Sequence, residues 1–189
     1  MKKNFVLGLL LLCSICFANE QKTVLAKRGA ILEIYSASLQ KVRPGAEEEP
    51  IAVVVDKGNQ FCHDNITRNS EVAKYRRQYL FKVWKGYVTI PADGTYVISL
   101  SYNYYGLNNS NTILEISQKP IMFISQVRRR GGESNLTATQ SIRLSQGSYE
   151  FKIIHRSGFR NDTFTLKIWN KKRPLRKMVV TPANMVHVE

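Results

Sequence analysis

The sequence predicts an all-β domain, built as a two-sheet sandwich or barrel with at most one short helix. Apolar residues alternate with polar ones far more often than they recur at helical spacing. The alternating runs are short, and clusters of turn-forming residues separate them. Many short strands joined by regular turns are typical of sandwiches and barrels. The chain has 189 residues, which suits a single ordinary domain.

Six runs of the chain have the pattern of strands. The alternation is clearest where Tyr149, Phe151 and Ile153 fall on one face of an extended chain. Glu150 and Lys152 fall on the other face, which indicates a strand that is buried on one side only. In chain order, the predicted strands are residues 30–35, 79–90, 95–101, 112–117, 148–155 and 163–169.

Turn and loop signals separate these strands. Residues 43–50 (RPGAEEEP) are polar and contain two prolines, which predicts a surface loop. Only residues 68–78 (RNSEVAKYRRQ) have the pattern of a helix, with Ser70 as its N-cap. The predicted turns are residues 91–94 (PADG), 145–147 (SQG) and 157–162 (SGFRND).

The first residues have the pattern of a secretory signal peptide. Lys2 and Lys3 form a positive start, an apolar run follows, and Ala18 is the small residue before a cleavage site. The apolar run is too short to span a bilayer comfortably, and no later segment is long and apolar enough to do so. We therefore expect a signal peptide at residues 1–18, one domain at residues 19–189 and no transmembrane segment. The processed protein is expected to be secreted or periplasmic.

One cysteine remains after removal of this leader. Cys13 and Cys16 lie within it, so only Cys62 is left. A single cysteine cannot form an intrachain disulfide, and the core alone must hold the fold together. We expect Cys62 to be a small buried apolar side chain. The alternative is a disulfide between two chains.

A motif in residues 81–101 makes the predicted fold more specific. An aromatic residue precedes a Gly-Tyr strand start, and Pro-x-x-Gly-x-Tyr follows across the predicted turn. Pro91 has the fixed φ that favours entry to a turn, and Gly94 supplies a position tolerant of positive φ. We expect Trp84 and Tyr96 to pack across the strands. The residues of the motif are Trp84, Gly86, Tyr87, Pro91, Gly94 and Tyr96.

These residues resemble the PA-fourteen (PA14) domain, a β-barrel module first named for the protective antigen of a bacterial toxin. The family also occurs in glycosidases and microbial adhesins. Residues 29–35, 142–155, 166–170 and 181–185 resemble further strands and the exit segment of the family, in the same order. The resemblance spans about residues 29–188 and implies a single two-sheet domain of the PA14 type.

The sequence departs from the family at its calcium site. The resemblance implies two adjacent aspartates after the second strand of the hairpin, which hold a calcium ion in sugar-binding members. Asn103 and Tyr104 stand at those positions, and Ser117 and Gln118 replace a later Asp-Gly step. Calcium takes about six to eight oxygen ligands, several of them charged. We therefore predict no calcium-dependent sugar site, and no metal or other cofactor.

The run SYNYYGLNN (residues 101–109) is the first candidate binding segment. Tyrosine gives a large contact area at low entropic cost, and asparagine adapts its hydrogen bonds to a ligand. The alternative is that these tyrosines belong to the core or pack the loop on itself. The candidate ligand-binding residues are Tyr102, Asn103, Tyr104, Tyr105, Asn108 and Asn109.

Positive charge supplies the second kind of candidate. The chain has 28 Lys and Arg residues against 14 Asp and Glu, a formal net charge of +14. Such charge attracts polyanions, and export favours an acidic glycan, lipopolysaccharide, anionic lipid or acidic protein over nucleic acid. The alternative for each cluster is a solvated rim of loops. The candidate basic patches are Arg128, Arg129 and Arg130, and then Lys171, Lys172, Arg173, Arg176 and Lys177.

Catalytic signals are weak. The run CHDN (residues 62–65) places Cys, His and Asp side by side, but neighbours on an extended segment point to opposite faces. His63, His155 and His187 show no metal-ligand spacing. The chain has no serine nucleophile elbow and no phosphate-binding glycine loop. We therefore predict that the protein is not an enzyme.

The sequence favours a secreted, non-catalytic recognition module. We expect an adhesin-like or virulence-associated protein that binds a glycan or an anionic surface polymer without calcium. The alternative is a protein-interaction subunit of an exported complex, such as a component of a toxin or a surface appendage. A further alternative is an accessory domain of a glycosidase system.

Overall fold

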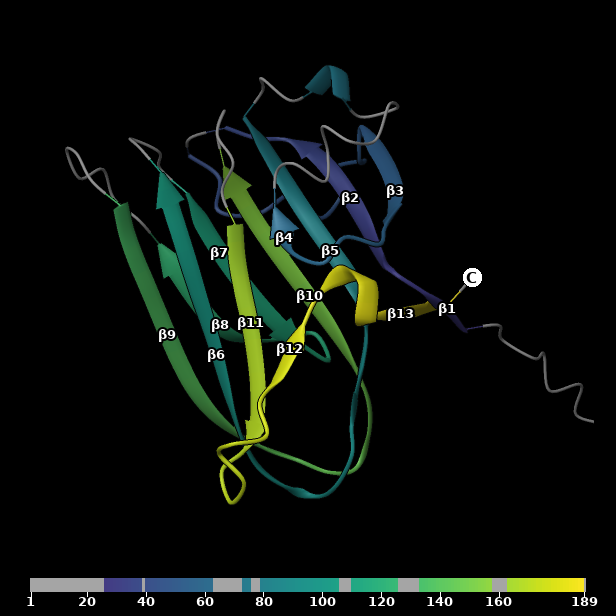
Figure 1. Cartoon of the computed structure of the whole chain (residues 1–189). Helices are drawn as coiled ribbons and strands as arrows, with labels where there is room; N and C mark the ends of the chain where they lie inside the picture. Colours follow the sequence, from purple (N-terminus) through teal and green to yellow (C-terminus); the bar gives the residue numbers. More distant parts are fainter. Residues whose placement is uncertain are drawn as a thin grey trace, which may run out of the picture.

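Two antiparallel sheets pack face to face to form a β-sandwich (Figure 1). The computed structural model describes residues 26–38, 40–62, 73–75, 79–105, 110–125, 133–157 and 163–188. The first sheet contains β1 (Ala26–Arg28), β2 (Ala30–Ser36), β3 (Ala52–Asp56), β5 (Leu80–Ile90), β7 (Asn111–Ile116), β8 (Lys119–Ser125), β10 (Gly147–Ser157) and β13 (Val186–Val188). The second sheet contains β4 (Phe61–Cys62), β6 (Gly94–Tyr105), β9 (Glu133–Leu144), β11 (Thr163–Asn170) and β12 (Met178–Val180).

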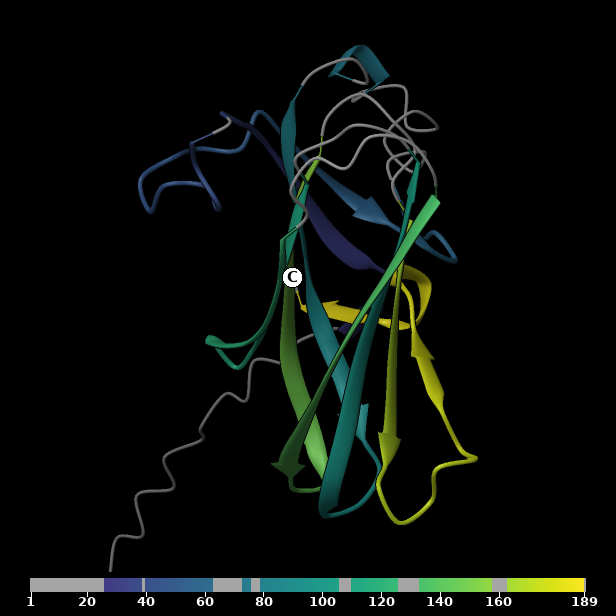
Figure 2. The ribbon, with the colours of Figure 1, turned by 90° about the vertical axis from the view of Figure 1, so that its left-hand side faces the viewer.

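The order of the strands brings both ends of the described chain into the first sheet. Its order is β1–β13–β5–β10–β7–β8, and β2 pairs with both β5 and β3. The order of the second sheet is β12–β11–β6–β9, with β4 also on β11. The β5–β6, β9–β10 and β11–β12 connections gather at one end of the sandwich, at the bottom of Figures 1 and 2.

The all-β prediction is confirmed, as are all six predicted strands. The strand predicted to end at Ser101 continues as β6 to Tyr105, so four of the candidate ligand-binding residues lie in a strand and not in a loop. Three of the strands that sequence reasoning missed are β3, β8 and β9. Of the predicted helix, the structure describes residues 73–75, which form the 3-10 turn η1 (Ala73–Tyr75). No helix within the described ranges is long and apolar enough to cross a membrane.

An aromatic cluster joins the two sheets in the core. Phe61 and Phe164 stack with their ring centroids 4.8 Å apart, and Trp84 meets both rings edge-on at 5.5 Å. Tyr96 is buried in the same core, and its hydroxyl donates a hydrogen bond to the carbonyl oxygen of Ala92 at 2.8 Å. Trp84 and Tyr96 therefore lie in one core, and Tyr96 also closes the β5–β6 turn. Cys62 is buried beside this cluster, as predicted.

Gly94 is required for a different reason from the one that the sequence predicts. The glycines with positive φ among the described residues are Gly29 and Gly147, so Gly94 does not need that freedom. A Cβ atom on Gly94 would instead lie 2.5 Å from the side-chain nitrogen of Asn170. The glycine therefore lets β6 and the end of β11 approach each other closely.

A second apolar cluster covers the outer face of the first sheet. Val83, Ile113 and Ile154 are buried, although their neighbours along each strand face the main core, so these side chains point the other way. Residues 37–38 and 40–50 form a strap that lies over them, with Ala37 packed against the cluster. The predicted loop at residues 43–50 is part of this strap.

Two arginines connect the strap to the first sheet by polar contacts. Arg156 is buried and donates to the carbonyl oxygens of Ser38 and Lys41. Arg43 in the strap reaches the buried carboxylate of Glu115, with 3.2 Å between Nη1 and Oε1. The strap is thus fixed to β7 and β10 by polar contacts above an apolar surface.

Candidate functional site

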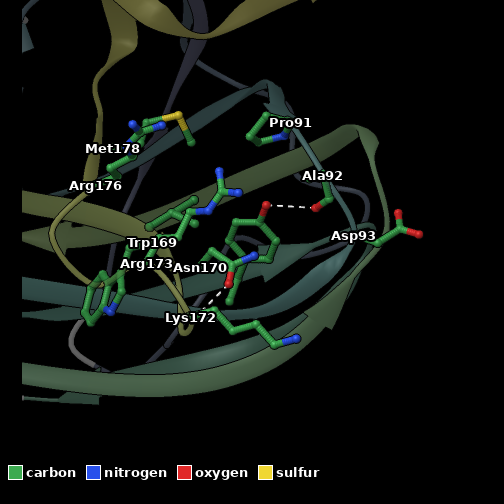
Figure 3. Close-up of a pocket in the computed structure, with 11 residues that line it drawn as sticks. Pro91, Ala92, Asp93, Trp169, Asn170, Lys172, Arg173, Arg176 and Met178 are labelled. Atoms are coloured by element: carbon green, nitrogen blue, oxygen red, sulfur yellow. Dashed lines mark hydrogen bonds between the residues drawn. The ribbon is translucent and has the colours of Figure 1, made fainter.

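A pocket of about 430 Å³ opens at the end of the sandwich where the β5–β6 and β11–β12 connections meet (Figure 3). Its size lies within the range of sites for small organic ligands. Eight residues of the strands and of the β5–β6 turn, and three residues of the loop between β11 and β12, form its wall. The lining residues are Pro91, Ala92, Asp93, Tyr96, Ile168, Trp169, Asn170, Lys172, Arg173, Arg176 and Met178.

The pairing of β11 with β6 fixes one wall of the pocket. Asn170 is in register with Tyr96, and the amide of Lys171 still donates to the carbonyl oxygen of Thr95 at 2.8 Å. Beyond that point the chain leaves the sheet as residues 171–177, which we call the basic loop. The amide of Lys172 donates to the side-chain oxygen of Asn170 at 2.9 Å, so the loop begins at a defined turn. It returns to the sheet at Met178.

Positive charge dominates the pocket. Lys172, Arg173 and Arg176 line it, and all three are exposed. The acidic lining residue, Asp93, accepts a hydrogen bond from the amide of Gln146 at 2.6 Å. Figure 3 shows the Asp93 carboxylate pointing away from the other labelled side chains. The lining of the pocket therefore has three cationic side chains and one carboxylate, which points away from them.

Aromatic and apolar side chains complete the pocket. Tyr96 and Ile168 are buried and form part of the inner wall, and Trp169 stands at its side. The ammonium group of Lys177 lies 4.9 Å from the centroid of the Trp169 ring. Such a cation–π contact adds to the order of the loop where it leaves β11. Flat rings beside cations suit a ligand that has both a C–H surface and a negative charge.

The basic loop and the Tyr and Asn run lie far apart. The five candidate cations of the basic loop are together at the Gly94 end of β6, and three of them line the pocket. The backbone of residues 102–105 forms the other end of β6, where Asn103 is in register with Thr163 and Asn135. Because a strand rises about 3.3 Å per residue, roughly 35 Å separates the two ends. The basic loop is therefore not the neighbour of the Tyr and Asn run.

Several other candidates cannot be placed. Asn108, Asn109 and Arg128 to Arg130 lie outside the described residues. The nearest described residue after the Arg128 cluster is Glu133, which pairs with Tyr105 at the end of β6 distant from the pocket.

Sequence reasoning found the cations of the pocket but missed its other walls. The signals were present: Trp169 and Asn170 stand directly before the basic loop, and the Pro91–Tyr96 motif forms the opposite wall. Only the pairing of β11 with β6 shows that these two segments meet.

His155 lies in the interior of the protein, where its ring has structural contacts. His155 is buried, its Nδ1 lies 2.9 Å from the hydroxyl of Thr112, and its ring contacts Phe164 at 5.5 Å. Within the described ranges, no three His, Cys, Asp or Glu residues come together as a metal site. The donor set at Asn103 and Tyr104 lacks the carboxylates that calcium prefers, so these residues do not fit the calcium ion of the PA14 family.

No protein-family model matches the chain, and neither does any curated protein sequence. Solved structures do match. A PA14 sugar-binding domain from an RTX adhesin aligns with a TM-score of 0.53 at 10% identity, over 85% of this chain and 98% of that domain. The epithelial adhesin 9 A domain from Candida glabrata, in complex with Galβ1-3GlcNAc, aligns with a TM-score of 0.53 at 9% identity, over 87% of this chain and 91% of that one.

A larger protein also matches. A β-glucosidase from Kluyveromyces marxianus aligns with a TM-score of 0.51 at 21% identity, over 75% of this chain. This chain spans only 16% of the length of that enzyme. At these identities the likeness shows the fold, and it agrees with the resemblance in residues 81–101. The chain has a PA14-like fold.

Proposed function

We propose that the protein is an exported, non-catalytic recognition module that binds an anionic glycan or surface polymer in the basic pocket, without calcium. One observation carries the proposal: Lys172, Arg173 and Arg176 converge on the same pocket as Tyr96 and Trp169. Charge-assisted hydrogen bonds from the cations would hold carboxylate, sulfate or phosphate groups. The aromatic residues would contact the C–H faces of sugar rings.

The structural relatives support a carbohydrate ligand. One is described as a sugar-binding domain, and another was solved with a disaccharide. The present chain lacks the aspartate pair of the family, so a sugar must be held by direct contacts. The cations of the pocket provide such contacts, and they favour an anionic sugar over a neutral one.

A glycan array tests the proposal. The chain beginning at Asn19 retains every element that the structure describes, and it is applied to neutral, sulfated, phosphorylated and carboxylated glycans with and without a calcium chelator. We expect binding to anionic glycans that is insensitive to the chelator. Replacing both Arg173 and Arg176 by Ala should weaken binding at least about tenfold, because two charge-assisted contacts are lost. Loss of binding with the chelator would refute the calcium-free site.

Matched variants separate this pocket from net charge and from the other end of β6. Lys57→Ala with Lys119→Ala removes the same charge from exposed positions on the first sheet and should have little effect. Tyr104→Ala tests the Tyr and Asn run as a separate ligand site. If Tyr104→Ala abolishes binding and the arginine variant does not, the ligand site is at the other end of the sandwich.

A second candidate function is docking of a protein partner on β3. Val53 and Val55 are 53% and 41% exposed, and they project from the same face of this strand. Such a surface would suit a subunit of an exported complex. Val53→Lys should abolish self-association or partner binding measured by light scattering, and binding unaffected by this change would exclude β3.

A further inference from the structure

The basic loop carries an apolar side chain at its tip. Leu175 is 97% exposed, the highest value among the large apolar side chains that the structure describes. Isolated apolar residues on a surface are common and need no explanation by themselves. Leu175 differs because of how the backbone presents it and which residues surround it.

The backbone holds Leu175 at the apex of a turn. The amide of Arg176 donates to the carbonyl oxygen of Arg173 at 3.1 Å, so Pro174 and Leu175 are the two central residues of a β-turn. Proline at the first central position has the φ that this turn requires. The amide of Arg173 in turn donates to the carbonyl oxygen of Asn170 at 2.8 Å. The exposure of Leu175 is therefore built into two consecutive turns.

Cations surround this apex. The basic loop contains five Lys and Arg residues and no acidic residue, and all seven of its residues are exposed. Lys172, Arg173 and Arg176 line the pocket, whereas Leu175 and Lys177 are not part of its wall. The loop thus presents an apolar tip and positive charge outside the pocket as well as within it.

A soluble polyanion would pair with the cations but would leave Leu175 in water. An anionic lipid surface satisfies both, because phosphate headgroups lie above an apolar layer. Four or more basic residues near such a surface bind it measurably, and burial of a leucine adds a favourable hydrophobic contribution. The combination of an ordered apolar apex and five cations therefore fits lipid better than a soluble chain.

We propose that the basic loop docks the protein on an anionic lipid surface, with Leu175 entering the acyl boundary and the loop cations meeting the phosphate groups. This goes beyond the binding of a glycan in the pocket, because it uses Leu175, which is not part of the pocket wall. It also names a partner that the pocket alone does not require.

Sedimentation with lipid vesicles tests the proposal. The chain beginning at Asn19 is mixed with vesicles of phosphatidylcholine alone or with one part in four of phosphatidylglycerol. We expect binding to the anionic vesicles only, and weaker binding at higher salt. Leu175→Ser should lower the partition coefficient about tenfold at unchanged charge. Phe123→Ser, a change at a side chain that is 54% exposed on β8, should leave it unchanged.

Charge is tested in the same assay. Lys171→Glu should weaken binding at least about fivefold, because this lysine is one of the five cations of the basic loop. Lys119→Glu makes the same change in net charge on β8 and should have a much smaller effect. Equal effects of the two lysine changes would show attraction by net charge alone and would overturn the docking geometry.

The insertion of residue 175 into the lipid layer is tested with a fluorescent side chain at that position. Leu175→Trp should show a blue-shifted emission on anionic vesicles and quenching by brominated lipid. An unshifted emission from the bound variant would refute insertion, and so would wild-type binding equal to that of Leu175→Ser. The glycan site in the pocket is tested separately. That proposal fails if the protein does not bind soluble anionic glycans in the absence of lipid.

Discussion

The indole nitrogen of Trp84 donates a hydrogen bond to the carboxylate of Asp56 inside the apolar core, with 2.7 Å between Nε1 and Oδ2. The other carboxylate oxygen accepts the amide of Gly58 at 2.8 Å. Asp56→Ala should therefore lower the free energy of unfolding by about 2–4 kcal/mol, because it leaves two donors without this acceptor. Urea denaturation followed by tryptophan fluorescence measures the change.

Asp93→Ala is the matched control for this variant. Asp93 also accepts a backbone amide, from Gln146, but this hydrogen bond is exposed. Water can replace the lost acceptor, so the variant should cost less than about 1 kcal/mol. Equal losses in the two variants would mean that burial of the Trp84–Asp56 pair contributes nothing.

Gly94→Ala should disturb the basic loop. The new methyl group would meet the side-chain nitrogen of Asn170, and the resulting shift of this side chain would disturb the hydrogen bond that its oxygen accepts from the amide of Lys172. We expect a loss of about 1–2 kcal/mol in the free energy of unfolding and weaker binding of anionic glycans.

The steric cause can be isolated by a double-mutant cycle. In Gly94→Ala with Asn170→Gly the space is restored, so the two changes should cost less together than the sum of the single variants. Gly45→Ala should be nearly neutral, because the nearest atom to its Cβ is 3.6 Å away. Strict additivity at Gly94 and Asn170 would contradict the close approach.

Arg43→Ala should loosen the strap. Glu115 is buried and would keep only Lys152 at 3.8 Å as an ion-pair partner. We expect a loss of about 1 kcal/mol and faster hydrogen exchange in residues 38–50. Lys41→Ala removes an exposed pair with Glu48 and should have little effect on the free energy of unfolding. Unchanged exchange in Arg43→Ala would show that this ion pair does not hold the strap.

Tyr35 should make the stability sensitive to alkaline pH. Burial raises the pKa of its phenol, and a hydrogen bond to the Glu33 carboxylate at 2.6 Å raises that pKa further. Unfolded tyrosine ionises near pH 10, so above about pH 10 the unfolded state loses this proton first and stability falls. The contribution is fully present below that pH.

The Tyr35→Phe variant lacks this proton, so its free energy of unfolding should decline less steeply above about pH 10. Urea denaturation at several alkaline pH values measures both slopes. Parallel slopes for wild type and variant would contradict the raised pKa.

Calcium should not stabilise the protein. A ligand that binds the folded state raises the melting temperature, and the residues at positions 103 and 104 supply no carboxylate. We expect millimolar calcium and magnesium to give melting temperatures within about 1 °C of each other. A specific rise with calcium, reversed by chelator, would show that carboxylates elsewhere in the chain bind the ion.

The sequence predicts the strands in which apolar and polar residues alternate strongly, and it predicts the other strands less well. The β10 strand alternates clearly because one face packs in the core, and its predicted position is confirmed. The β9 strand lies at the edge of the second sheet, and its described side chains at Thr137, Thr139 and Gln140 are exposed. Ala138, Ile142 and Leu144 pack toward the core in alternation with polar residues, but Gln140 interrupts this pattern in the middle of the strand.

The β7–β8 hairpin was missed for a different reason. Ser117 and Gln118 have φ values of 48° and 66°, as in a two-residue hairpin turn. Such turns usually contain Asn or Gly, and neither is present here. For the candidate site, the run of cations was visible in the sequence, but the meeting of Trp169 with the Pro91 turn depends on strand pairing that sequence patterns do not reveal.

The pairing of β1 with β13 has a consequence for how the chain folds. Ala26 is in register with Val188, and β13 also contacts β5 through Val186 and Tyr87. The first sheet cannot form completely until residues 186–188 have left the ribosome, so β1 cannot pair with β13 before that point in synthesis. Such non-local pairing slows folding to about milliseconds or seconds. The chain therefore remains incompletely folded until β13 is available to pair with β1 and β5.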